Sequence, residues 1–172
     1  MKSHFQMFAR YNQWANRALY DAAALLTDAQ YRENRGAFFG SVHGTLNHLL
    51  TTDRVWFQRI IGNGETGAVP DRLDAILFED FAGLREARVA EDARIIAYLD
   101  GLSDAAYAGS IRYRRVSTPD EFDQKLIAAL AHVFNHQTHH RGQAHALLTA
   151  HGQDGPVLDL LQYQRLADKN LA

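Results

Sequence analysis

Cysteine is absent from this chain of 172 residues, so no disulfide stabilises it and any thiol nucleophile it used would have to be a bound small molecule. No run of 18 apolar residues exists, which excludes a transmembrane helix. The N-terminal residues lack the apolar segment of a signal peptide, and we expect a cytoplasmic protein without membrane contact. With 18 basic and 20 acidic residues, the net charge of −2 argues against a general nucleic-acid binder.

Proline is also rare, and its three occurrences separate long segments with an apolar period. Hydrophobic residues recur there at steps of three, four and seven, which predicts four amphipathic helices. The expected helices span about residues 3–26, 41–62, 79–100 and 120–151. Ser3 and Ser41 are the expected N-caps of the first two, and Gly62, Gly101 and Gly152 mark the ends of the last three.

The remaining segments are short. We interpret residues 31–40 as a linker, residues 110–119 as an extended excursion or hairpin arm, and residues 158–168 as a short C-terminal helix. Apolar residues make up 47% of the chain, and its length suits one domain over residues 1–172. The sequence therefore predicts an all-α fold: an up-down four-helix bundle followed by a short C-terminal helix.

Histidine is the residue that stands out, because five of the nine lie between His132 and His145. Imidazoles four residues apart on a helix point the same way, with Cβ atoms about 5–6 Å apart. The pairs His132/His136 and His136/His140 both have this spacing. At about 100° per residue, His140 lies at the border of the apolar face and His136 one step further along the same flank. His132 and His139 lie well outside this face, as solvated residues or supports of a ligand, and His145 lies on the opposite flank.

A metal site needs a further ligand, and the residues alone leave it open. His43 and His48 are the candidates from the second expected helix, although His48 falls off the apolar stripe of that helix. Asp53 falls in the middle of the stripe, where it could be a ligand, an acceptor for an imidazole N–H or half of an ion pair. Gln137 replaces the general-base Glu of an H-E-x-x-H protease, which excludes that class. The spacing of the pair is equally typical of a His-rich solvated helix.

Four blocks of sequence resemble the DinB (damage-inducible) family. They are YNQWANRAL at 11–19, SVHGTLNHLLTTDRVWFQRI at 41–60, HVFNHQTHHRGQAHALL at 132–148 and GPVLDLLQYQR at 155–165. The resemblance implies an up-down four-helix bundle, a homodimer, and a divalent metal bound by three His. By their place in the matching blocks, these are His48, His136 and His140, and the resemblance makes Asp53 a supporting or structural residue.

The resemblance also suggests chemistry. Three neutral His ligands leave at least one coordination position open, which is typical of catalytic sites. Imidazoles suit zinc and nickel alike. The wider superfamily includes thiol-dependent S-transferases, so we expect a metal-dependent enzyme that uses a low-molecular-weight thiol, with Arg141 or Gln143 as candidates to orient the substrate. The alternative is a non-catalytic metal-binding stress-response protein.

Two further features bear on partners. The run Arg112–Arg115 could grip phosphates, but a solvated strand is the favoured interpretation, and we expect no nucleic-acid partner. The first expected helix offers more aromatic surface than one buried face uses. The aromatic residues of this helix are Phe5, Phe8, Tyr11 and Trp14. The surface that is not needed for the core could contact a second copy of the chain or line the metal cleft.

Overall fold

The computed structural model describes residues 1–62, 72–114 and 120–171, and most of these residues are helical, as predicted. The helices are α1 (Lys2–Ala23), α2 (Asp28–Arg32), α3 (Val42–Ile61), α4 (Phe81–Gly101), the short 3-10 helix η1 (Ala106–Ala108), α5 (Leu126–Ala150) and α6 (Leu160–Ala167). Two strands, β1 (Ser110–Arg114) and β2 (Glu121–Lys125), pair antiparallel. None of the described helices is both long and apolar enough to cross a bilayer.

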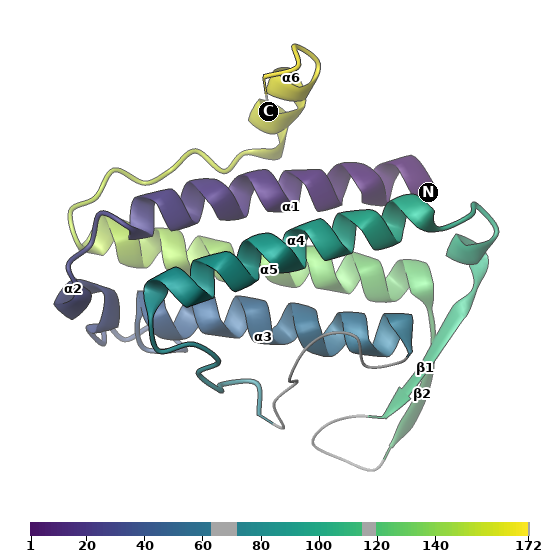
Figure 1. Ribbon diagram of the computed structural model, residues 1–172, viewed down its shortest axis with the longest axis horizontal. Helices are drawn as coiled ribbons and strands as arrows, with labels where there is room; N and C mark the ends of the chain where they lie inside the picture. The colour runs from purple at the N-terminus through teal and green to yellow at the C-terminus, as the bar shows by residue number, and fades with distance from the viewer. Residues whose placement is uncertain (63–71, 115–119, 172) are drawn as a thin grey trace.

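The four long helices lie side by side (Figure 1). Helix α1 packs against α4 and α5, and α3 packs against the same two helices. The β1–β2 hairpin stands at one end of these helices and α2 at the other, while α6 projects beyond α1 (Figure 1). This arrangement places α3 and α5, which carry the predicted ligands, next to each other.

Local chemistry explains where several helices begin and end. The Ser41 hydroxyl accepts a hydrogen bond from the Gly44 N–H at 3.0 Å and caps α3, as predicted. Gly62 ends α3 in the left-handed conformation with φ of 87°. Asp80 caps α4, which therefore begins slightly later than expected. The predicted cap at Ser3 is wrong: α1 begins at Lys2 and Met1 takes the N-cap position without a side-chain hydrogen bond.

Two other expectations were wrong. The expected linker includes the end of α2, which Thr27 and Gln30 start with a reciprocal capping box. The last long helix begins at Leu126 rather than near residue 120, because residues 121–125 form β2. Acidic side chains of β2 face arginines of β1 across the hairpin, a pairing that stabilises strands but has no counterpart in a helix.

The interior has two large apolar clusters with a polar layer between them, and a smaller third cluster of Tyr11, Ala15 and Tyr163 lies where α6 meets α1. One large cluster includes Phe5, Phe57, Ile95, Leu99, Leu130 and Phe134, and the other includes Leu19, Leu46, Leu50, Leu84, Leu147 and Leu148. On every long helix, the residues between these positions include buried polar side chains: Asn12, Asn16, Asp53, Arg88, Asp92, Gln137 and Arg141. The core is therefore divided by a layer of hydrogen bonds and ion pairs.

Much of the aromatic excess on α1 packs within the chain. Phe5 and Tyr11 are buried, and Phe8 stacks on Phe134 of α5 with ring centroids 5.7 Å apart. Trp14 contacts Tyr163 of α6 at 5.8 Å. None of these aromatic contacts reaches the three predicted ligands, so these rings do not line the expected metal cleft.

Candidate metal centre

The three predicted ligands lie together between α3 and α5. His48 comes from α3, and His136 and His140 come from successive turns of α5. One potential ligand nitrogen from each ring lies within 4.8 Å of the others, and Nε2 of His48 is 3.3 Å from Nε2 of His136. Metal-bound imidazole nitrogens lie about 2.0–2.1 Å from zinc, so separations of this size suit a shared ion.

Hydrogen bonds orient two of the rings. Nδ1 of His48 donates to the backbone carbonyl of Leu73 at 2.7 Å, since a carbonyl can only accept. Nδ1 of His140 donates to Oε1 of Gln143 at 2.8 Å. Each ring therefore carries its proton on Nδ1, which leaves the lone pair of Nε2 available. Partners of this kind fix both the tautomer and the direction of a ligating imidazole.

The carbonyl of Leu73 belongs to a segment that Asn47 fixes in place. The Asn47 side chain is fully buried, and its Oδ1 accepts from the backbone N–H groups of Leu77 and Phe78 at 2.9 and 3.0 Å. Its Nδ2 donates to the carbonyls of His43 and Phe78 at 3.1 and 3.2 Å. This amide therefore ties the segment before α4 to the turn of α3 that carries His48.

The environment of the rings keeps them neutral. Burial, aided by repulsion from His140, lowers the pKa of His48 to about 4, although the hydrogen bond to Leu73 opposes this shift. Burial and the neighbouring histidines lower the pKa of His136 to about 3. Burial also lowers the pKa of His140. Neutral imidazole is the form that binds metals, so all three rings are in the ligating state at pH 7.

Phe39 forms one wall of the site and was missed by the sequence analysis. Its ring stacks on His48 with centroids 3.7 Å apart and meets His140 edge-on at 5.4 Å. Gly44 permits this arrangement, because a Cβ there would overlap the carbonyl oxygen of Phe39. The available signal was the pair Gly40 and Gly44 around the α3 cap, but it does not reveal which ring the loop presents.

The other histidines lie outside the group. His132 is exposed and packs against Trp56 at 4.8 Å, and His139 is exposed beside Gln143. His43 lies between the carbonyl of Phe78 at 3.0 Å and Arg32 at 3.5 Å, so it serves to hold α3 rather than to join the three rings.

Asp53 is the ion-pair member that the sequence allowed. Its carboxylate accepts from Arg88 of α4 at 2.7 Å, and Arg88 also pairs with Asp92 at 2.9 Å. Asn16 of α1 donates to Asp92 at 3.1 Å. Asp53 is thus neither a member of the His group nor the acceptor for its N–H groups.

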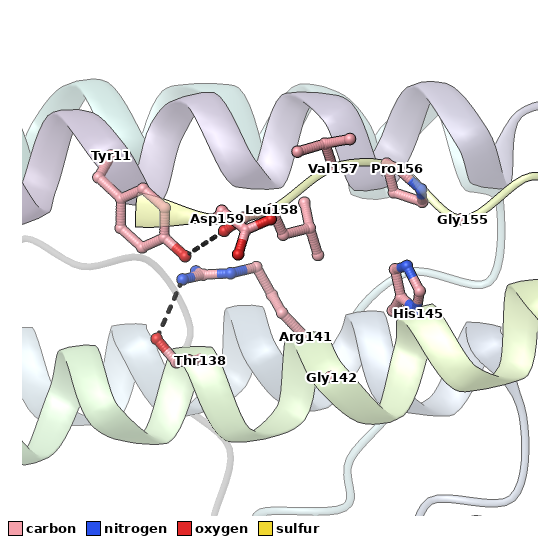
Figure 2. A pocket seen from close by; sticks show the side chains of 10 residues that line it. All are labelled: Tyr11, Thr138, Arg141, Gly142, His145, Gly155, Pro156, Val157, Leu158 and Asp159. Carbon is pink, nitrogen blue, oxygen red and sulfur yellow. Dashed lines mark hydrogen bonds between the residues drawn. The ribbon is translucent and has the colours of Figure 1, made fainter. Parts of the chain in front are cut away.

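Arg141 extends from α5 towards Tyr11 of α1 (Figure 2). It is buried, donates to Asn12 and to Thr138, and lies over the ring of Tyr11 at 5.2 Å. A pocket of about 460 Å³ separates this region from the segment of residues 155–159. These contacts do not support a role for Arg141 in orienting a substrate at the His group. Gly142 has open space around it, so no helix approaches closely there.

The basic run on the hairpin is paired across the strands. Arg112 contacts Asp123 at 3.2 Å, and Arg114 contacts Glu121 at 2.6 Å. Tyr113 donates to Gln124 at 2.9 Å. Arg115 lies outside the described residues. The described part of the run is therefore a charge-balanced strand, as the favoured interpretation expected.

The fold and the site together define a class: a mainly helical protein in which three imidazoles from two helices meet. Within that class, this chain belongs to the DinB family, since the family model described as DinB family matches residues 1–171. A DinB-like protein from Bacillus cereus ATCC 10987 has a similar fold, with a TM-score of 0.67 and 16% sequence identity over 87% of this chain and 94% of that chain. Comparison with curated proteins finds no match.

Proposed function

We propose that this protein binds one divalent metal ion through His48, His136 and His140 and uses it as a metal-dependent enzyme of the thiol-dependent S-transferase type. The observation that carries the proposal is the convergence of three ligand nitrogens within 4.8 Å from two helices. We further propose that the four long helices form the up-down bundle expected for the family and hold these nitrogens in place.

The donor set fits a catalytic ion. Among the described residues, no carboxylate joins the three imidazoles, so the ligands neutralise none of the ion's charge. Three protein ligands also leave a coordination position for a substrate or water. An ion bound there would lower the pKa of a thiol and so supply a nucleophile at neutral pH. Zinc and nickel suit imidazole about equally, and both are candidates.

The thiol would be a small molecule, because the chain has no cysteine. We propose that its sulfur forms a bond to an electrophilic carbon of the second substrate while a leaving group departs with the bonding electron pair. A cytoplasmic location would suit this chemistry, since thiols are kept reduced there.

The first test is metal binding by the purified, chelator-treated protein. We expect titration calorimetry with zinc or nickel chloride to give one ion per chain. Alanine at His48, His136 or His140 should weaken affinity by more than about 100-fold, since loss of a residue that merely supports a ligand already costs about 10–100-fold. The matched controls His132→Ala and His145→Ala should bind like wild type. Equal binding by all five variants would refute the assignment.

The second test is turnover. The metal-loaded protein is mixed with glutathione or cysteine and an electrophile such as 1-chloro-2,4-dinitrobenzene, and thioether formation is followed by absorbance. We expect a rate above that of the metal-free protein and of His136→Ala. Absence of turnover with a wide range of thiols, electrophiles and metals would favour the alternative, a non-catalytic metal-binding stress-response protein.

One observation favours that alternative. His48 is 3% exposed and His140 8% exposed, and Phe39 covers part of both, so a bound ion would be well enclosed. A structural ion contributes folding free energy. Full unfolding of the protein on metal removal would therefore support the non-catalytic function, and a folded metal-free protein would support the enzyme.

We also propose a homodimer, as the family resemblance implies. A groove of about 850 Å³ runs between α1 and α4, and its lining includes Trp14, Ile96 and the exposed Val89. Its lining also includes charged side chains such as Arg10, Arg17 and Arg85, so the groove offers a second copy both apolar and charged contacts. Sedimentation equilibrium should give a dimer for wild type and a monomer for Val89→Glu, whereas a wild-type monomer would contradict the proposal.

A further inference from the structure

We propose that Gln143 is a positioning residue that sets His140 as an Nε2 ligand, and that the tautomer of His139 is coupled to the orientation of the Gln143 amide. The inference rests on the proposed metal function for its effect on affinity, but the state of the His140 ring can be measured without any metal. The three residues form one chain of contacts along the outer side of α5, at successive i, i+3 and i, i+4 spacings.

The amide of Gln143 decides which nitrogen of His140 carries the proton. Its Oε1 lies 2.8 Å from Nδ1 of His140, and an amide oxygen can only accept. Nδ1 of His140 must therefore donate, which leaves the Nε2 lone pair for a metal. The reversed amide would present its NH₂ group to Nδ1, and the His140 proton would then sit on Nε2 and block ligation.

His139 is the other contact of the Gln143 amide. Its Nε2 lies 3.1 Å from the amide nitrogen of Gln143, which donates to it. The reversed amide would place its oxygen there instead and would accept from the Nε2–H tautomer of His139, so the tautomer of His139 and the orientation of the amide are coupled. The ring of His139 is exposed, and its Nδ1–H tautomer supports the ligating orientation of His140 through the Gln143 amide.

His140 depends on this help more than His48 does. The Nδ1 of His48 is held by the backbone carbonyl of Leu73, an acceptor that cannot reverse. His140 is held by a side-chain amide on its own helix, which can rotate through either orientation. Side chains that hold ligating imidazoles in this way typically change metal affinity by about 10–100-fold when removed.

The first measurement is the ring tautomer in the metal-free protein, from long-range ¹H–¹⁵N correlation spectra of the histidine side chains. Signals of His140 are assigned by their loss in His140→Phe. We expect the Nδ1–H form of His140 in wild type and in Gln143→Glu, whose carboxylate accepts in either orientation. Gln143→Leu should give a mixture of both tautomers. An unchanged His140 spectrum in Gln143→Leu would overturn the proposal.

The second measurement is zinc affinity by competition with a chromophoric chelator. We expect a loss of about 10–100-fold in Gln143→Leu, a smaller loss in His139→Leu, and rescue in Gln143→Glu. Gln58→Leu makes the same change at an exposed position of α3 and should have no effect. Equal affinity in Gln143→Leu and Gln58→Leu would count against the role of Gln143. A wild-type protein that binds no metal would refute the proposed function, while the tautomer spectra would still decide this inference.

Discussion

Two polar groups lie in the interior of this protein, and they are built on opposite principles. In the first, Arg88 of α4 pairs with Asp53 of α3 and with Asp92, and all three side chains are almost fully buried. In the second, His48 and two histidines of α5 bring three bases together. Asp53 lies only five residues after His48, so one helix contributes to both groups.

The difference lies in where the opposite charge comes from. The Arg88 group contains its own counter-charges, and removal of one member leaves another buried charge unpaired. The histidine group holds no acid among the described residues, and burial together with mutual repulsion disfavours its protonation. A group of this kind could hold the metal ion proposed above. The first group fits a role in holding the helices together, and the second fits a role in binding.

Breaking the first group should have the largest effect on stability. Arg88→Met would leave Asp53 and Asp92 buried without their partner, and we expect a loss of about 3–5 kcal/mol in the free energy of unfolding. Urea titration followed by circular dichroism at pH 7 measures it. Arg85 lies on the same helix as Arg88 and forms a half-exposed pair with Asp21 of α1, so Arg85→Met should cost less than about 1 kcal/mol. Equal losses in the two variants would contradict the distinction.

The second group should respond to metal instead. Zinc at about 100 times its dissociation constant should stabilise the wild-type protein by about 2.7 kcal/mol, because the ion binds only the folded state. His136→Leu should abolish this gain, yet its metal-free form should be at least as stable as wild type, because a half-buried base is replaced by an apolar side chain of similar size. Paired thermal melts with and without zinc test both statements.

The stability contributed by the histidine group should also depend on pH. His48 and His136 have pKa values of about 4 and about 3 in the folded protein, below the ordinary value of 6.5. Between the ordinary pKa and the folded-state values, the unfolded chain binds more protons than the folded protein does. The stability that these histidines contribute is therefore fully present above pH 6.5 and falls as the pH drops towards 4. After allowance for solvent screening, we expect the free energy of unfolding to fall by about 2 kcal/mol over this pH range.

The measurement is the urea midpoint of metal-free protein from pH 7.5 to 4.5, compared with that of His136→Leu. Carboxylates titrate in both proteins, so their contribution largely cancels in the difference. A wild-type loss no steeper than that of His136→Leu would show that the pKa of His136 is not depressed.

Sequence spacing predicted the parts of the site that depend on one helix. His136 and His140 follow from the i, i+4 rule, and the α3 boundaries follow from Ser41 and Gly62. His48 was one of two candidates from its helix and was selected only through family resemblance, because it lies off the apolar stripe of that helix. It is nevertheless buried, since Phe39 and the segment containing Leu73 cover it from outside the helix. A helical wheel has no information about such covering segments.

The β hairpin illustrates the same limit. Residues 121–125 were assigned to a helix because they precede a strongly helical segment, and their alternating charges were overlooked. The strand forms because Glu121 and Asp123 lie across from Arg114 and Arg112. Cross-strand pairing depends on which segment lies alongside, and local propensity does not specify it.

The smallest predicted effect tests the covering segment itself, by comparing two glycines. Gly44→Ala would place a Cβ against the carbonyl of Phe39 and push this loop away from His48, at a cost on the order of 1 kcal/mol. Gly142→Ala lies close to His140 in sequence but meets open space, and should stabilise α5 by about 0.5–1 kcal/mol.

Zinc affinity and the free energy of unfolding in urea are measured for both variants. The chemical shifts of the His48 ring protons report whether Phe39 still stacks on this ring. We expect Gly44→Ala to shift the His48 signals and weaken zinc binding, because Phe39 no longer holds the ring in place. Gly142→Ala should leave both unchanged. If Gly44→Ala lowers stability but leaves His48 and zinc binding as in wild type, Phe39 covers the site without orienting it, and Leu73 alone sets the direction of His48.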